Sequence, residues 1–190
     1  MKIEKLISFI LSPQIIALYV TIIFSLFSPI GLGSIDVFTS IFIGSLFLTI
    51  IPLFSIFYFY KKKGIDLDDP KRNERVDMYI IGLISYLVSS LIFWILNCHV
   101  MFVISMTYLF VGSAISLINL FWKVSAHSAG ITGPITSLVY IFGFNLIPLY
   151  ILAIPIFWIR IKFKAHDILQ ITVGSIVAIF ITSLVYKILW

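Results

Sequence analysis

The segment Lys123-Val124-Ser125-Ala126-His127-Ser128-Ala129-Gly130 is a short polar stretch between two long apolar runs. It places a cation, a hydroxyl and an imidazole within five residues, and a glycine follows. Ionisable side chains are costly at membrane depth, so such a group in an apolar chain indicates a pathway or a site. Two more polar segments lie at residues 61–77 and 160–170. We expect all three to meet at one face of a membrane bundle and to bind a phosphate.

The composition points to an integral membrane protein. Of the 190 residues, 61% are hydrophobic and only 11% are charged, and the mean hydropathy is +1.16. A soluble domain carries about 25% charged residues. We therefore expect one all-α domain over residues 1–190, a polytopic transmembrane bundle of about six to seven helices.

The net charge of +5 is best explained by membrane topology and contacts with lipid headgroups, and nucleic acid is a poor explanation for it. Cys98 is the only cysteine, which excludes an intrachain disulfide and a thiol metal cluster. The N-terminal apolar run has no small-residue cleavage site and continues too far for a signal peptide. We interpret it as the first span.

Turn signals and charges divide the chain into apolar runs of about the length that crosses a bilayer. Gly31 and Gly33 mark the first turn, Lys61 to Gly64 stop the second run, and Asn97 to His99 form a tight turn. The expected spans are 6–30, 37–60, 78–96, a fourth to about 122, and a last one at 168–189. The uncharged run 131–159 fits one tilted span or a hairpin of two short helices broken near residues 145–148.

The distribution of positive charge favours the hairpin. With a hairpin, residues 160–170 return to the same side as the other two polar segments, and every Lys and Arg except Lys187 lies on that side. Loops rich in Lys and Arg usually remain cytoplasmic. We therefore expect the site on the cytoplasmic face, with the plasma membrane as the host membrane and His99 on the opposite face without a role.

Two motifs resemble the type 2 phosphatidic acid phosphatase superfamily. Ser125 and His127 fall on the Ser and His of its Pro-Ser-Gly-His motif, and Arg160-x5-His166-x3-Gln170 matches the spacing of its Ser-Arg-x5-His-x3-Asp motif. Val124, Ala126 and Ile159 replace the Pro, the Gly and the second Ser, and Gln170 replaces the Asp. A branch that acts on dolichyl diphosphate has a similar His-x3-Gln pattern. The Lys-x6-Arg-Pro motif is absent, and Arg75 with Lys71 or Arg72 is the best substitute.

The residues also fit phosphoryl transfer on chemical grounds. Guanidinium groups bind phosphate oxygens in pairs, and the reaction needs positioning and charge stabilisation above all. A neutral imidazole can attack phosphorus, and a second can protonate the leaving group. These groups need no metal or other cofactor, and the carboxylates at residues 66–69 lack the second cluster that a magnesium site needs.

By the resemblance, His166 is the nucleophile, His127 the general acid, and Gln170 holds the His166 ring. The expected phosphate ligands are Arg160, Arg75, Arg72, Lys71 and Lys123, helped by the Ser125 hydroxyl and the backbone near Gly130.

The sequence thus predicts a lipid phosphatase that hydrolyses a lipid phosphate or a polyisoprenyl diphosphate through a phosphohistidine. Its partners would be that substrate and membrane lipids. Two alternatives remain: a non-enzymatic carrier of an anionic or lipid-linked phosphate, which uses the cations without needing the His pair, and a structural membrane subunit. Each polar segment, taken alone, also fits a solvated or interfacial loop.

Overall fold

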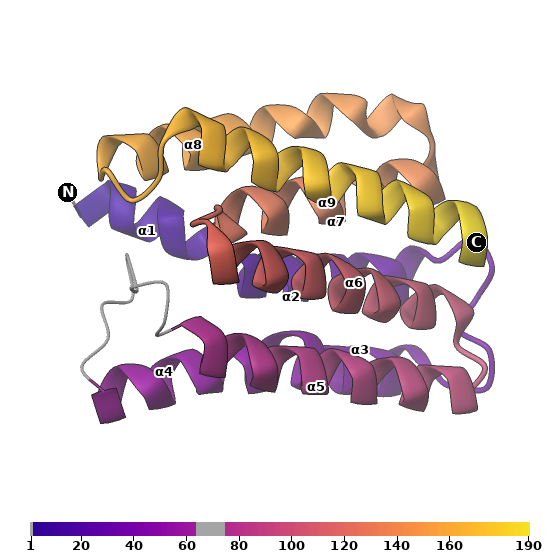
Figure 1. Ribbon diagram of the computed structural model, residues 1–190. Coiled ribbons are helices and arrows are strands. Elements are labelled where there is room, and N and C mark those ends of the chain that lie inside the picture. The colour runs from indigo at the N-terminus through magenta and orange to yellow at the C-terminus, as the bar shows by residue number, and fades with distance from the viewer. Residues whose placement is uncertain (1, 64–74) are drawn as a thin grey trace.

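The apolar runs form helices that lie roughly along one axis, with the N-terminus at one end and the C-terminus at the other (Figure 1). The computed structural model describes the backbone of residues 2–63 and 75–190, which contains helices and no strand. The elements are α1 (Lys2–Ile10), α2 (Pro13–Phe27), α3 (Val37–Gly44), η1 (Ser45–Ile50), α4 (Ile51–Lys63), α5 (Arg75–Ile95), α6 (His99–Phe121), α7 (Ala126–Phe142), η3 (Phe144–Leu152), α8 (Ala153–Lys162) and α9 (Ile168–Leu189).

Five helical segments in the described part of the chain are long and apolar enough to cross a membrane: Val37–Phe59, Met78–Ile95, His99–Phe121, Phe144–Lys162 and Ile168–Leu189. The first is continuous through α3, the π-helical η1 and α4. The shorter α2 is also apolar. The predicted all-α membrane bundle is therefore confirmed. Together with α2 and α7, these segments make seven passes along the bundle axis.

The first predicted span, residues 6–30, is wrong as a single helix. α1 ends at Ile10 and α2 begins at Pro13, with Ser12 in an extended conformation between them (φ −68°, ψ 151°). The proline ring clashes with a helical residue before it, so the residue before Pro13 leaves the helix. The sequence contained this signal. The consequence is that α1 is a separate helix at the end of the bundle that carries the polar segments.

The hairpin in residues 131–159 is confirmed, although the turn lies slightly earlier than predicted. α7 ends at Phe142, and Gly143 takes a left-handed φ of 101°, which glycine adopts without a steric penalty. The chain returns through η3, a 3₁₀ segment containing Pro148, and then α8. The α6–α7 and α8–α9 connections therefore lie toward the same end of the bundle (Figure 1).

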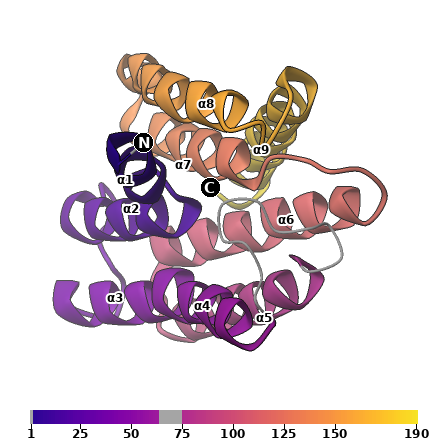
Figure 2. The same cartoon turned by 90° about the vertical axis from the view of Figure 1, so that its left-hand side faces the viewer.

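Helix α7 occupies the centre of the bundle. Most of its residues are buried, and it packs against α9, η3, α2, α6 and α8. Viewed along the helices, α3, α4 and α5 form one side, α2 and α6 the middle, and α7, α8 and α9 the other side (Figure 2). Small residues permit these close approaches, because helices in a membrane associate by packing more than by the hydrophobic effect. A Cβ on Gly44 of α3, for example, would lie 2.6 Å from Thr21 Cγ2 of α2.

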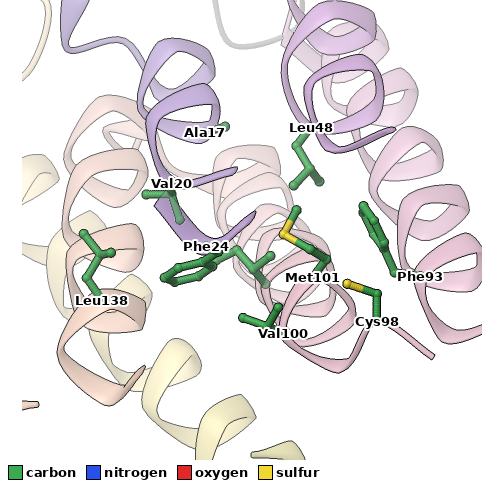
Figure 3. Packing of buried hydrophobic residues seen from close by; sticks show 10 residues of the cluster. Ala17, Val20, Phe24, Leu48, Phe93, Cys98, Val100, Met101 and Leu138 are labelled. Atoms are coloured by element: carbon green, nitrogen blue, oxygen red, sulfur yellow. The ribbon is translucent and has the colours of Figure 1, made fainter. Parts of the chain in front are cut away.

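The main hydrophobic core fills the end of the bundle far from the polar segments. Figure 3 shows Phe24, Leu48, Phe93, Met101 and Leu138 of this cluster, which come from five different elements. Buried serines bridge the helices beside it, with Ser25–Ser40 and Ser89–Ser105 hydroxyl pairs at 2.7 and 2.9 Å.

The two loops at this far end are also fixed to each other. The Ser34 amide donates to Leu96 O at 3.2 Å, and only a glycine fits at position 33, because a Cβ there would lie 1.9 Å from Asn97 O. The far end of the bundle is therefore tightly packed.

Candidate functional site

The α6–α7 connection positions the first motif through a helix cap. Ser125 is extended (φ −81°, ψ 106°), and its hydroxyl accepts from the Ser128 amide at 3.3 Å, as an N-cap does. The Ser128 hydroxyl donates back to Ser125 O at 2.9 Å. Ser125 is completely buried. His127 lies within the first turn of α7, directly after this cap.

The α8–α9 connection folds tightly around the backbone of Arg160. Its carbonyl accepts from the amides of Ala165 and His166 at 3.0 and 3.2 Å, and Lys164 takes a left-handed φ of 55° in the turn. Asp167 then caps α9, with its carboxylate accepting from the Gln170 amide at 2.8 Å. These bonds hold His166 at the last position before the cap, directly beside the end of α8.

Gln170 holds the His166 ring. Gln170 Oε1 lies 2.9 Å from His166 Nδ1, and His166 is only 4% exposed. The four-residue spacing brings the two side chains together at the start of α9. With the amide oxygen as acceptor, Nδ1 carries the proton and Nε2 keeps its lone pair. This is the tautomer in which Nε2 can act as a nucleophile.

The two motifs are connected by their backbones. The Ser125 amide donates to Gln170 O at 3.2 Å, so the residue that contacts His166 also contacts the cap of α7. Gly174, one turn further along α9, permits this approach. A Cβ there would lie 2.5 Å from Ser128 Oγ and 2.7 Å from Ser125 O. The starts of α7 and α9 therefore form one fixed unit.

His127, Arg160 and His166 line one cavity of about 200 Å³. Arg160 is only 3% exposed, so its charge lies inside the protein. Among the described residues that line the cavity, none is acidic. The remaining lining comes mostly from apolar and aromatic side chains of α2, α4, α5, α6 and α7. The described lining of the cavity therefore has basic side chains at one end and apolar walls.

Gly130 also lines this cavity, and its position has a packing reason. A Cβ there would lie 2.5 Å from Pro13 Cβ. Gly130 is the fifth residue of α7, and it allows the start of α2 to contact α7 where Pro13 and Gln14 reach the cavity. The contact with α2 explains why residue 130 is a glycine, and no bound ligand is needed to explain it.

Two of the predicted phosphate ligands, both within the described residues, do not line the cavity. The buried Ser125 hydroxyl acts as a cap, and neither Ser125 nor the half-buried Lys123 is among the residues that line it. Arg75 begins α5, but its side chain lies outside the described residues, as do Lys71 and Arg72. In the described ranges, no group of three His, Cys, Asp or Glu side chains is arranged to hold a metal ion.

Sequence reasoning missed the residues that support the site. Asp167 is one of them, and Asp167-x-x-Gln170 is a helix-start pattern that could have been recognised. Gly174 and Pro13 also support the site. Their contacts join distant parts of the chain, so no local sequence pattern could have revealed them. The tyrosines of the cavity wall, Tyr86 and Tyr108, had no signal because an aromatic residue in an apolar run usually faces lipid or core.

A salt bridge connects α1 to α8 at the same end of the bundle. Lys162 Nζ lies 2.5 Å from Glu4 Oε1 and 4.5 Å from the centre of the Trp158 ring. The hydrogen bond from Lys162 lowers the pKa of Glu4 to about 2. Glu4 precedes the first spanning helix, so this pair fastens a terminal helix to the outside of the bundle.

The fold and the site define an integral membrane helix bundle in which the buried Arg160 and His166 and the partly buried His127 (the His–Arg cluster) line one end of a cavity. The chain matches no protein-family model, no curated protein and no solved structure. Its function therefore has to be inferred from the chemistry of the cluster.

Proposed function

We propose that this protein is a membrane-embedded lipid phosphatase, which hydrolyses a lipid phosphate or a polyisoprenyl diphosphate through a phosphohistidine. The observation that carries this proposal is the cavity lined by His127, Arg160 and His166, with Gln170 on Nδ1 of His166. The resemblance of the two motifs to the type 2 phosphatidic acid phosphatases agrees with it. The positive charges around the site favour a cytoplasmic active-site face.

In the first step of this mechanism, His166 Nε2 attacks phosphorus and the bond from phosphorus to the leaving oxygen breaks. His127 gives its proton to that oxygen, so a lipid alcohol leaves neutral and a lipid monophosphate leaves with one negative charge fewer. The Arg160 guanidinium offsets the charge on the phosphoryl oxygens as they pass through the transition state. The product of this step is a phosphoryl group bonded to His166 Nε2.

In the second step, a water molecule attacks the same phosphorus atom. His127, now neutral, takes a proton from the water, and the bond from phosphorus to Nε2 breaks. Inorganic phosphate leaves and both histidines return to their starting forms. Positioned proton transfer of this kind contributes roughly 10²- to 10⁴-fold to a rate. Since a proton shuttle and a nucleophile respond differently to the leaving group, the two histidines can be distinguished experimentally.

The test is phosphate release by the purified protein in detergent, with an alkyl phosphate and an aryl phosphate as substrates. We expect His166→Ala to abolish turnover of both. His127→Ala should lower turnover of the alkyl ester by roughly 10²-fold or more, and that of the aryl ester much less, because phenolate leaves without protonation. Phosphopeptide mapping should find the phosphoryl group on His166.

Turnover retained by His166→Ala would remove the nucleophile from the proposal. A carrier would bind phosphate esters and release no phosphate in detergent, where no transport is possible. A structural subunit would neither bind phosphate esters nor release phosphate. The double change of His127 and His166 would then affect only its stability.

A further inference from the structure

The cavity extends well beyond the His–Arg cluster into the bundle. Its lining on α6 runs from Ser116 and Ile115, near the cluster, back to Ile104. Twelve residues of helix at 1.5 Å per residue correspond to about 18 Å along the bundle axis. Ile104 also belongs to the packed core, so the core forms the floor of the cavity.

The walls of this deeper part are apolar and aromatic. Tyr86 of α5 and Tyr108 of α6 lie side by side, with ring centres 5.5 Å apart, and both line the cavity. Gly82 keeps the space beside it open, and Gly112 permits close contact with Leu83, 3.1 Å from where its Cβ would lie. A Cβ on Gly82 would meet nothing closer than the Tyr86 ring at 3.9 Å. The deeper part therefore has the lining that a hydrocarbon chain requires.

The volume limits what can enter. An engineered protein cavity of about 150 Å³ holds a single benzene ring. The present cavity, at about 200 Å³, has room for one chain segment of roughly that bulk and not for two chains side by side. Because the same cavity ends at His127, Arg160 and His166, the chain and the phosphate would belong to one molecule.

We propose that the cavity is the binding site for the single hydrocarbon chain of a lipid phosphate, with its phosphate at the His–Arg cluster and its chain directed toward Tyr86, Tyr108 and Ile104. The substrate class is accordingly single-chain phosphates, such as polyisoprenyl or monoalkyl phosphates, in preference to diacyl lipids. This inference rests on the proposed function for its phosphate end, and on the cavity alone for its chain end.

The test is the dependence of kcat/KM on chain length, measured with monomeric alkyl phosphates from ethyl to octyl. For the unmodified protein we expect a rise of up to about fourfold per methylene, which corresponds to burial of about 0.8 kcal/mol per methylene. Gly82→Phe should fill the chain site, so ethyl phosphate should keep its kcat/KM within about twofold while the gain with length disappears. An unchanged gain in Gly82→Phe would overturn the proposal.

Two variants make the result decisive. Ile84→Phe adds the same ring two residues away, at a lipid-facing position that is 57% exposed, and should behave as the unmodified protein. Val111→Phe approaches the same cavity from α6 and should reproduce Gly82→Phe if that variant does not fold. A two-chain phosphate should compete with octyl phosphate at least tenfold more weakly than a single-chain phosphate does. Equal competition would contradict the single-chain assignment.

Binding without turnover separates this inference from the proposed function. An octyl phosphate with a terminal diazirine should label α5 and α6 residues of the cavity in the unmodified protein and in Ile84→Phe, and not in Gly82→Phe. If no phosphate ester is hydrolysed but this labelling is found, the phosphatase proposal fails and the chain site stands. Labelling spread equally over the lipid-facing surface of all three proteins would refute the chain site.

Discussion

At the scale of single residues, Gln170 is the most informative position. Its backbone is bonded on both sides, by Asp167 and by the Ser125 amide, while its side chain contacts His166. A neutral amide in this place fixes the tautomer of His166 without adding charge. A carboxylate would fix the same tautomer and also favour the protonated, positively charged ring.

Two substitutions of Gln170 should therefore distinguish its effect on the orientation of the His166 ring from an effect on the charge of that ring. Gln170→Ala removes one hydrogen bond worth about 1.4 kcal/mol and should lower kcat/KM roughly tenfold without moving the pH profile. The isosteric Gln170→Glu should retain orientation and shift the acid limb of the pH–rate profile toward higher pH, because a carboxylate holds a proton on the ring. Profiles of kcat/KM against pH for the three proteins provide the measurement. Identical profiles for Gln170→Glu and the unmodified protein would show that the amide does not act on His166.

At the scale of helices, the small α1 is separated from the bundle by the break at Ser12 and Pro13. The Glu4–Lys162 pair fastens it to α8, two residues after Arg160, which lines the cavity. Because the pair is partly exposed, it is open to screening by salt. α1 is thus a helix whose attachment can be changed without changing the packed core.

The attachment of α1 should depend on pH. The folded pKa of Glu4 is lowered from 4.5 to about 2, so the pair stabilises docking above pH 4.5 and this contribution is lost as the pH falls toward 2. A spin-label distance between α1 and α8 should lengthen over that interval. In Glu4→Gln the distance should already be long or variable at neutral pH and should not change with acid. A transition of the same size in Glu4→Gln would assign the effect to another group.

At the scale of the whole molecule, seven passes place the two ends of the chain at opposite ends of the bundle (Figure 1). We expect the end with the His–Arg cluster to face the cytoplasm, because every Lys and Arg of the described residues except Lys187 lies toward it. A reporter that is active only outside the cytoplasm should therefore be active when fused after Trp190 and inactive when fused before Met1. The reverse pattern would place the cluster on the outer face. Equal activity at both ends would contradict the odd number of passes.

The sequence was sufficient to predict most of the helical spans, because a long apolar run between charged stops crosses a membrane as a helix. It also predicted the return of residues 160–170 to the side of His127, from charge alone. The break before Pro13 was readable and was missed. The contacts of Gly130 with Pro13 and of Gly174 with Ser125 could not be read, because they join residues far apart in the chain. For the same reason the cavity, whose walls come from several helices, was not predicted.

The joined loops at the far end of the bundle have a mechanical consequence. Helices fixed at one end behave as cantilevers, so a small rotation at the fixed end becomes a large displacement at the tip. A tilt of about 5° over a helix of about 30 Å moves its free end by roughly 2.6 Å. The loops joined through Ser34 and Leu96 would act as the clamp, and the cavity-lining ends of α4 and α5 could move away from the fixed starts of α7 and α9 and recover elastically while the clamp stays shut.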